Sequence, residues 1–175
     1  MDSLQDFPLP LLGFAAYSGT GKTTLLEQLI TILSEQGFKV GLIKHSHHDI
    51  ELDKPGKDSF RLRQAGASQV ILAGKQRSIC FHEQQQPSDR SLIKQLSLLD
   101  TAELDLVLVE GYRDQAFAKI ELHRAILNKP YIYTDDQHVI ALVSDTHVES
   151  CALPQFQFTQ VTELIAFIKQ SVINK

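Results

Sequence analysis

The sequence predicts an α/β fold of three layers, with helices on both faces of a mainly parallel sheet and one added antiparallel β-hairpin. Two observations lead to this prediction. Short apolar runs, typical of buried strands, alternate along the chain with segments that have the 3.6-residue period of amphipathic helices. The first group of elements, at residues 9–43, has the order strand, Gly-rich turn, helix, strand, which is the order of a βαβ unit.

The elements of the N-terminal half follow from local patterns. The apolar run 9–16 predicts a strand, and the broad apolar face of 22–36 predicts a helix that is buried against a sheet. A second strand is expected at 40–43. After a polar loop, a short helix is expected at 58–65, with Asp58 as its cap.

The remaining elements include the hairpin. Residues 69–73 and 78–83 flank a short polar turn, and such a turn requires antiparallel pairing. A further amphipathic helix is expected at about 92–99. The last elements are strands at 104–109, 118–122 and 139–143 and a closing helix at 161–172.

The length and composition describe an ordinary globular domain. The chain has 175 residues, of which 43% are hydrophobic and 22% charged. We therefore expect one domain over residues 1–175, with the hairpin inserted at about 69–83. The net charge is −4 and the basic residues are scattered, which argues against a non-specific nucleic-acid binder.

The cellular context follows from what the sequence lacks. Cys80 and Cys151 lie far apart and outside any C-x-x-C pattern, so we expect neither a structural zinc site nor a disulfide framework. The N-terminus has no signal-peptide pattern, and no apolar run has membrane-spanning length. We expect a soluble cytoplasmic protein without a membrane or nucleic-acid partner.

The first strand and helix flank a phosphate-binding motif. The segment Ala16-Tyr-Ser-Gly-Thr-Gly-Lys-Thr23 matches G-x-x-x-x-G-K-[ST] except at its first position, where alanine fits if its φ stays negative. Lys22 is expected to bridge β- and γ-phosphate oxygens, and the Thr23 hydroxyl to bind Mg²⁺. The expected nucleotide-binding residues are Ser18, Gly19, Thr20, Gly21, Lys22, Thr23 and Thr24.

The alternative to a phosphate-binding loop is a Gly-rich turn that matches the motif by chance. The position of the motif, after an apolar strand and before a helix, argues for the functional interpretation. There, successive backbone N–H groups can point into one concavity, and the helix adds its positive N-terminal dipole.

An acidic residue at the end of a neighbouring strand is needed to hold the metal ion. Glu110 follows the apolar run 104–109 and is the candidate, whereas Asp105 lies at the wrong end of that strand. The alternative is that Glu110 is only a solvated residue at the end of a strand.

The loop after the second strand contains His45-Ser-His47-His48-Asp49. These side chains are of the metal-binding type, but consecutive histidines in an extended loop point in diverging directions, so a polar loop at the sheet edge is the alternative. At that edge the acidic and basic residues of this region can contact phosphate, Mg²⁺ or a second substrate. They are Asp49, Asp53, Lys54, Lys57 and Asp58.

Three further residues carry weaker indications. Arg61 and Arg63 can meet a phosphate, but both are expected to be solvated surface charges. Asp145 follows the strand 139–143, where a nucleobase can lie. The Asn-Lys-x-Asp signature of many GTPases is absent, so the spacing does not identify the base.

Together these segments resemble one family, the molybdopterin-guanine dinucleotide biosynthesis protein B (MobB) family. The resemblance runs in order over nearly the whole chain, and Ala16 and Tyr112 depart only slightly from the commonest forms. The segments that carry it are the phosphate-binding loop, Gly41-Leu-Ile-Lys-His45-Ser-His-His-Asp49, Asp53-Lys-Pro-Gly-Lys-Asp-Ser59, Arg63-Gln-Ala-Gly-Ala67 and Leu108-Val-Glu-Gly-Tyr112.

The resemblance implies a function and a site. The family is similar to the dimeric P-loop GTPases of the signal-recognition and nitrogenase-iron type. The resemblance implies a GTP-binding accessory protein with weak GTPase activity, which assists the guanylyltransferase that joins GMP to molybdopterin. Catalytic roles would fall to Lys22, Asp49 and Asp53, and the metal would bind Thr23 and Glu110. The other implied cofactor-binding residues are His45, His48, Lys54, Lys57 and Asp58, and Asp145 is expected to bind the nucleotide because of its place after the strand 139–143. A homodimer with an exchanged hairpin, here 69–83, is also implied.

Three other functions stay open at this level. A small-molecule kinase usually has an Arg-rich lid over the phosphates, whereas the arginines here are dispersed. A metallochaperone GTPase would use the histidines of the 45–49 loop to carry nickel or zinc. The third alternative is a pure adaptor whose bound nucleotide is structural.

Overall fold

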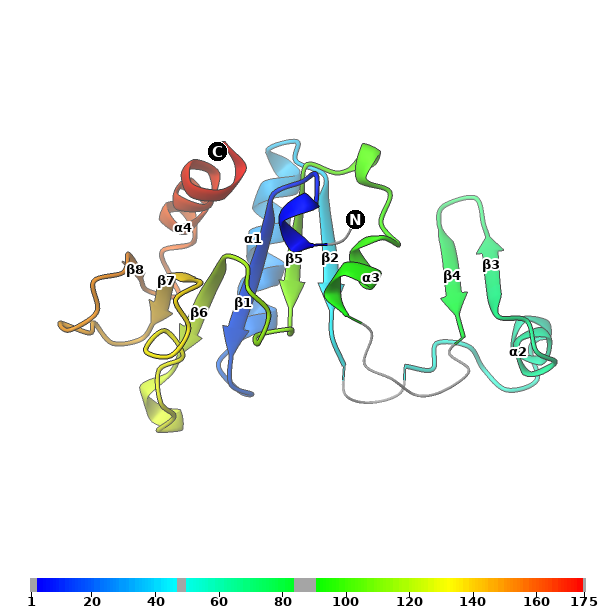
Figure 1. Ribbon diagram of the computed structural model, residues 1–175, viewed down its shortest axis with the longest axis horizontal. Coiled ribbons are helices and arrows are strands. Elements are labelled where there is room, and N and C mark those ends of the chain that lie inside the picture. The colour runs from blue at the N-terminus through cyan, green and yellow to red at the C-terminus, as the bar shows by residue number, and fades with distance from the viewer. Residues whose placement is uncertain (1–2, 47–49, 84–90, 175) are drawn as a thin grey trace. The chain divides into compact units, whose positions relative to one another are not determined.

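The chain folds into two compact units. The computed structural model describes residues 3–46, 50–83 and 91–174. Unit 1 contains Met1–His45 and Ser91–Lys175, and unit 2 contains Ser46–Arg90, which is inserted between the two parts of unit 1 (Figure 1). Each unit is described by itself below.

Unit 1 is built on a six-stranded sheet with the order β2-β5-β1-β6-β7-β8, in which every pair of neighbours is parallel. The strands are β1 (Leu11–Ala16), β2 (Val40–Lys44), β5 (Leu106–Glu110), β6 (Lys119–His123), β7 (Val139–Ser144) and β8 (Gln155–Phe156). The sequence predicted all of these strands except the two-residue β8.

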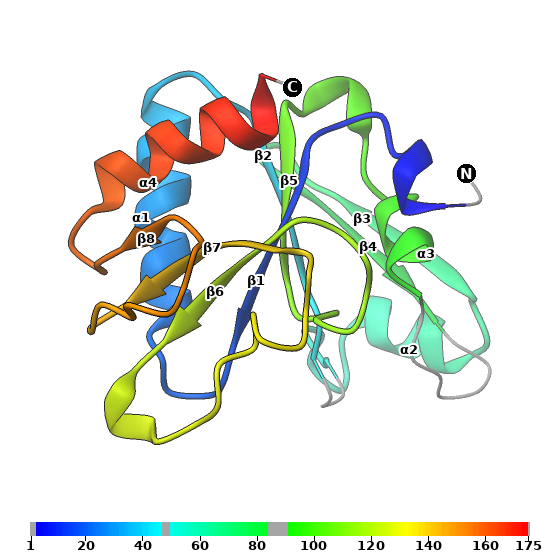
Figure 2. The same cartoon turned by 60° about the vertical axis from the view of Figure 1, so that its left-hand side comes forward.

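Helices cover both faces of this sheet, which makes three layers (Figure 2). On one face lie α1 (Lys22–Glu35) and α4 (Val161–Ile168), and α4 continues as a π-helical turn at Lys169–Ile173. On the other face lies α3 (Leu92–Leu96). Short 3₁₀ turns occur at Leu4–Asp6, Thr101–Glu103 and Ala125–Leu127. No helix in these described ranges has the length and apolar character needed to cross a membrane.

Strand β5 lies between β2 and β1 and is covered on both faces, which explains why its sequence is apolar throughout. Leu106 and Leu108 belong to the core shared with α1 and α4, whereas Val107 and Val109 pack with α3 on the opposite face. All of these side chains are fully buried, and burial of each stabilises the fold by about 1.5–3 kcal/mol. A parallel strand with both faces covered therefore shows a continuous apolar run rather than alternation.

Strand β6 differs, because only one of its faces is apolar. Ile120 and Leu122 belong to the core with α1 and α4, and the residues that alternate with them are Lys119, Glu121 and His123. These three polar side chains are nevertheless buried. The segment 130–138 covers their face, as its hydrogen bonds to β6 show.

Unit 2 contains one helix, α2 (Asp58–Gln64), and a hairpin of β3 (Gln69–Ala73) and β4 (Ser78–His82). The hairpin is antiparallel, as its tight turn predicts, and places Val70 opposite Phe81. The N-cap of α2 is Lys57, so Asp58, which the sequence suggested as the cap, lies in the first turn instead. The predicted three-layer α/β fold with a mainly parallel sheet and a small antiparallel pair is confirmed.

Arg63 holds unit 2 together, and the expectation that it is a solvated surface charge is wrong. Its side chain is only 6% exposed, and two of its nitrogens lie 2.7 Å from Glu51 and Glu83 carboxylate oxygens. Its guanidinium also lies 4.4 Å from the centre of the Phe81 ring. The charge is buried because paired carboxylates and an aromatic face replace its hydration. Arg61, in contrast, is exposed.

Candidate functional site

The phosphate-binding motif forms the turn between β1 and α1, at the carboxyl edge of the sheet. Gly19 and Gly21 have φ values of 84° and 91°, which side-chain-bearing residues rarely adopt. Thr20 is buried, and its hydroxyl donates to the carbonyl oxygen of Tyr17 at 3.0 Å. The two glycines and this internal hydrogen bond give the loop its shape.

Alanine fits the first position of the motif for the expected reason. Among the residues that the structure describes, only Tyr112 and Asn128 combine a side chain beyond hydrogen with a positive φ. Ala16 therefore keeps a negative φ, and its methyl group causes no backbone strain.

The start of α1 supplies the electrostatic part of the site. Gly21 is the N-cap of this 14-residue helix, and the first backbone bond inside it joins the amide of Leu25 to the carbonyl of Gly21. The preceding amides have no partner within the helix, and the helix dipole places partial positive charge there. Thr23 and Thr24 are exposed in this first turn. The arrangement suits a phosphate group.

Glu110 lies next to this loop, as the sequence predicted from its place after β5. Its two carboxylate oxygens lie 3.6 Å from the Nζ of Lys22 and 3.1 Å from the Nζ of Lys44. Strands β1, β5 and β2 are neighbours in the sheet, so their ends bring these three side chains together. Only 14% of the Glu110 side chain is exposed, which argues against a merely solvated residue.

His45 is fixed beside Glu110 by the backbone. Its amide donates to the carbonyl oxygen of Glu110 at 2.8 Å, and its ring lies 4.6 Å from that of Tyr112. Gly111, between Glu110 and Tyr112, has a φ of 102°, and a Cβ there would lie 2.6 Å from the Cβ of His45. Only glycine allows this close approach of the two strand ends.

Arg124 is part of the site, although the sequence reasoning missed it. Its Nε donates to the carbonyl oxygen of Thr20 at 3.2 Å, and its guanidinium lies 3.8 Å from the centre of the Phe158 ring. The signal was present: Arg124 directly follows β6, just as Glu110 ends β5. It was overlooked because isolated arginines are usually surface charges.

Asp145 lies at the end of β7 and contacts the same region. One oxygen accepts a hydrogen bond from the amide of Ala125 at 3.0 Å, and the other lies 3.9 Å from a nitrogen of Arg124. Asp145 thereby holds the turn that carries Arg124 beside the loop. Leu127 of this turn would be 3.8 Å from a Cβ placed on Gly19.

The remaining predicted site residues belong to unit 2 or lie outside the described residues. Lys54, Lys57 and Asp58 belong to unit 2 and are exposed there. Asp53 also belongs to unit 2, where its Oδ2 lies 3.8 Å from the Nε of Arg63. His48 and Asp49 lie outside the described residues.

A cluster of metal-binding side chains was one interpretation of the histidine loop. The ranges that the structure describes contain no group of three or more His, Cys, Asp and Glu side chains placed to hold a metal ion. Most of that loop is not among the described residues, so its metal-binding interpretation stays untested.

Comparison with solved structures supports the fold. The MobB protein homologue from Bacillus stearothermophilus superimposes with a TM-score of 0.70 at 23% identity, and covers 94% of this chain and 99% of that one. Bacillus subtilis MobB superimposes with a TM-score of 0.73 at 22% identity, and covers 95% of this chain and 100% of that one. At such low identity these likenesses show the fold alone.

Sequence comparison identifies the family. The chain is 50% identical over 138 residues to the molybdopterin-guanine dinucleotide biosynthesis adapter protein of Escherichia coli strain K12, covering 78% of this chain and 79% of that protein. It is 44% identical over 141 residues to the adapter protein of Haemophilus influenzae, covering 81% and 78%. The model of the family described as molybdopterin guanine dinucleotide synthesis protein B matches residues 11–145, which contain the whole constellation around Lys22 and Glu110. The chain belongs to the MobB family.

Proposed function

We propose that this protein is a cytoplasmic GTP-binding adapter protein of molybdopterin-guanine dinucleotide biosynthesis. The relatives that share up to half of its residues carry this adapter role in their names. The observation that carries the nucleotide-binding part is the position of Glu110 beside Lys22, at the open side of a glycine loop that leads into a helix N-terminus. A lysine, a carboxylate and free amides at one point suit a nucleoside triphosphate with its metal ion.

The residues present fit Mg²⁺. The Thr23 hydroxyl and the Glu110 carboxylate are oxygen ligands, which a hard cation prefers. Mg²⁺ bound there would neutralise phosphate charge, and Lys22 would bind the β- and γ-phosphate oxygens. Lys44, which shares Glu110 with Lys22, would keep the carboxylate in place when Lys22 turns to phosphate.

Guanine is the base that we propose for the nucleotide. Guanine carries two N–H donors on one edge, for which a carboxylate is the matching acceptor. Asp145 supports the proposal, because it lies at the carboxyl edge two strands from β1 and accepts a hydrogen bond from the turn that carries Arg124. Arg124 would hold the loop and the base region together through its bond to Thr20.

Hydrolysis would be slow, as befits an accessory factor rather than a dedicated enzyme. Lys22 would stabilise the charge that develops on the phosphates. We propose that Asp49 and Asp53 orient the attacking water, with His45, His48, Lys54, Lys57 and Asp58 as further polar contacts. For Asp53 this requires a rearrangement, since its carboxylate now faces the buried Arg63.

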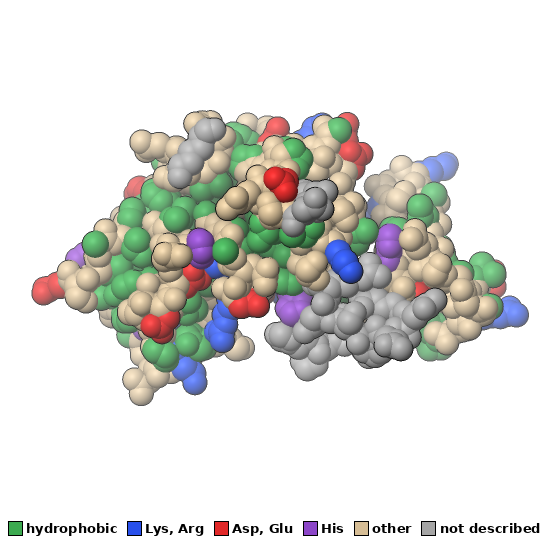
Figure 3. Space-filling view, in the orientation of Figure 1, with side chains coloured by type: hydrophobic (Ala, Val, Ile, Leu, Met, Phe, Trp, Pro, Cys, Tyr) green, Lys and Arg blue, Asp and Glu red, His purple; other side chains and the backbone are tan. Residues whose placement is uncertain are grey.

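The proposed partners are molybdopterin, the guanylyltransferase that attaches GMP to it, and a second copy of this chain. The hairpin Gln69–Glu83 supports the dimer, because Ile71 and Ile79 are 67% and 37% exposed. Figure 3 shows hydrophobic side chains at the surface of the part that carries β3 and β4. A two-stranded ribbon with open edges and exposed apolar residues is marginal alone and is suited to pairing with another chain.

The decisive experiment is a pull-down of the guanylyltransferase and molybdopterin by this protein, with and without GTP and Mg²⁺. We expect the guanylyltransferase to be retained, and more of it with GTP than without. Retention of nothing, together with no GTP binding in calorimetry, would overturn the proposal.

A further inference from the structure

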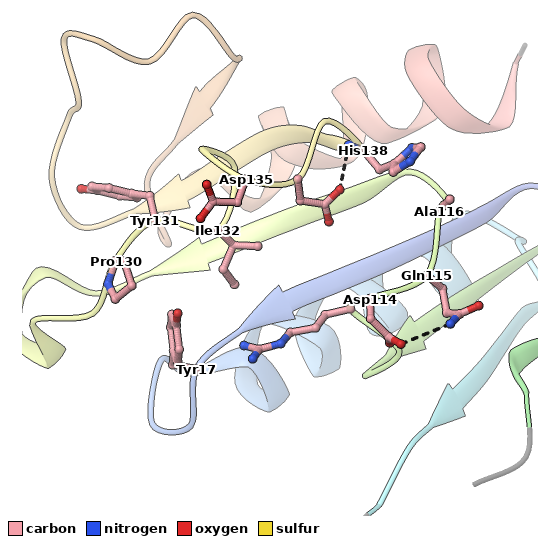
Figure 4. A pocket seen from close by; sticks show the side chains of 11 residues that line it. Tyr17, Asp114, Gln115, Ala116, Pro130, Tyr131, Ile132, Asp135 and His138 are labelled. Atoms are coloured by element: carbon pink, nitrogen blue, oxygen red, sulfur yellow. Dashed lines mark hydrogen bonds between the residues drawn. The ribbon is translucent and has the colours of Figure 1, made fainter.

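Unit 1 contains a pocket of about 420 Å³ that the phosphate-binding constellation does not use. Figure 4 shows Asp135 and Ile132 on one side of this space, Asp114 and Gln115 on the other, and Tyr17 at the end next to the phosphate-binding loop. One wall is the segment after β5, and the other is the segment that precedes β7. The volume is within the range of small-molecule sites.

The wall before β7 is anchored on the polar face of β6. The amides of Ile132 and Tyr133 donate to the two carboxylate oxygens of Glu121, each at 2.8 Å. Lys119 binds Asp136 at 2.7 Å. Buried charged groups such as Lys119 and Glu121 are costly unless each has its partners, so this wall is held in one place.

The aromatic ring of this wall is also held in a fixed orientation. The Tyr131 ring stacks on the His123 ring at 4.0 Å, and His123 Nε2 is hydrogen-bonded to the carbonyl oxygen of Lys129 at 2.9 Å. A ring positioned before a ligand arrives does not lose conformational entropy on binding. The pocket therefore offers two aromatic side chains, Tyr131 and Tyr17, to a planar ligand.

The charges at the pocket are arranged unevenly. At the end next to the phosphate-binding loop, the guanidinium of Arg113, which lines the pocket, lies 5.6 Å from the centre of the Tyr17 ring. Farther along, Asp135 is an exposed carboxylate at the pocket. A ligand that fits both ends has an anionic group at one end and N–H donors at the other.

We propose that this pocket binds a pterin that carries a phosphate ester, which is the pterin half of molybdopterin-guanine dinucleotide. The flat ring would contact Tyr131, its amino and ring N–H groups would donate to Asp135, and its phosphate would lie beside Arg113. This inference rests on the proposed function, since it places the second half of the dinucleotide next to the nucleotide half. Tyr17 lines the pocket and directly precedes Ser18 of the phosphate-binding loop, so the two sites are adjacent in the chain.

The binding test uses 6-hydroxymethylpterin phosphate as the probe, because its ring is fluorescent and it is chemically stable. We expect saturable quenching on titration with the full-length protein, and the same quenching when the protein is first saturated with GTP and Mg²⁺. Asp135→Asn and Arg113→Gln should each weaken probe binding about tenfold or more, since each removes a charged hydrogen-bond partner. Both side chains are exposed, so neither substitution threatens folding.

Two matched controls remove the same charges elsewhere on the chain. Glu149→Gln and Arg77→Gln alter exposed residues that do not line the pocket, and both should bind the probe like the wild type. GTP binding, measured separately by calorimetry, should be unchanged in all four variants.

The outcomes separate this inference from the proposed function. A wild-type protein that binds GTP and retains the guanylyltransferase but does not quench the probe would overturn the pterin pocket alone. Probe binding that Asp135→Asn and Arg113→Gln weaken, in a protein that does not bind GTP, would support the pocket and overturn the nucleotide function. GMP that displaces the probe with equal affinity would make the pocket a purine site, and the pterin assignment would be wrong.

Discussion

The Nζ of Lys22 lies 3.6 Å from an oxygen of Glu110, so the first residue of α1 and the last residue of β5 form one ion pair. Lys44, from the end of β2, contacts the other oxygen of the same carboxylate. One acid thus links two lysines at the carboxyl edge of three adjacent strands. Lys22 is paired with Glu110 in the structure. Binding of a triphosphate is therefore expected to replace the Glu110 carboxylate with a phosphate oxygen as the anionic partner of Lys22.

Lys22→Ala is expected to abolish triphosphate binding and to leave the fold intact. Lys22 contributes charge at the start of a helix, and the buried positions of α1 are leucines farther along. Calorimetric titration with GTP and Mg²⁺ measures the effect. Lys39→Ala is the control, since Lys39 pairs with Glu103 at the opposite edge of the sheet, and this variant should bind GTP normally. Unchanged affinity in Lys22→Ala would contradict the site.

Glu110→Gln is expected to weaken nucleotide binding in the presence of Mg²⁺ by about tenfold or more, because the amide lacks the charge that a hard cation prefers. Binding without Mg²⁺ should change little. Titrations of GTP with Mg²⁺ and with a chelator provide the comparison, and Glu103→Gln is the matched control. If the Mg²⁺ dependence of Glu110→Gln equals that of the wild type, the metal is held by another acid.

The hairpin is expected to mediate dimerisation, and Ile71→Asp tests this. Ile71 is 67% exposed, so its replacement does not disturb packing within unit 2. Phe81 is a poorer choice, because its ring packs against the buried Arg63. Sedimentation should show dimers for the wild type and monomers for Ile71→Asp, with Ile126→Asp, exposed in unit 1, as a dimeric control. A wild type that is monomeric at micromolar concentration would refute the prediction.

Asp136→Asn is expected to lower the free energy of unfolding by about 3 kcal/mol, because it leaves the buried Lys119 without its anionic partner. Asp135→Asn is a neighbouring control on an exposed residue and should change stability by less than about 0.5 kcal/mol. Chemical denaturation of both variants measures the difference. Equal stabilities would mean that the ion pair does not hold the segment before β7.

The effect of Asp136→Asn should also depend on pH. Burial alone would raise the pKa of Asp136, but the hydrogen bonds from Lys119 and the amide of His138 hold it below its ordinary value of 3.8. A lowered folded-state pKa contributes stability above the unfolded-state pKa and loses it as the pH falls through the folded-state value. The two proteins should therefore differ most near neutral pH and converge below about pH 3.8.

The phosphate-binding side of the site could be predicted because it is local. The glycines, Lys22 and Thr23 are close in sequence, and the loop between a strand and a helix forms from those residues alone. Predicting the position of Glu110 required one further rule, namely that parallel strands have their carboxyl ends at the same edge of the sheet. The Asp58 cap was misplaced by one residue, because Asp and Glu are favoured both at the cap and in the first turn.

The polar residues on the covered face of β6 could not be identified in this way. Lys119, Glu121 and His123 alternate with apolar residues, which in an isolated strand indicates a solvated face. They are buried because the segment that follows β6, at 130–138, folds back over them and supplies a carboxylate and two amides. Arg63 was misread for the same reason, since its partners Glu51 and Glu83 lie outside α2.

The sequence by itself determined the order of strands and helices, the parallel sheet and the phosphate-binding loop, since these depend on hydrophobic period and on glycine at fixed positions. Only the tertiary structure decided that Arg124 bonds to Thr20, that β6 has a buried charged face and that a pocket lies beside Tyr17. Each of these features depends on which segments meet in the folded unit, and that choice is made by packing of the whole unit rather than by local pattern.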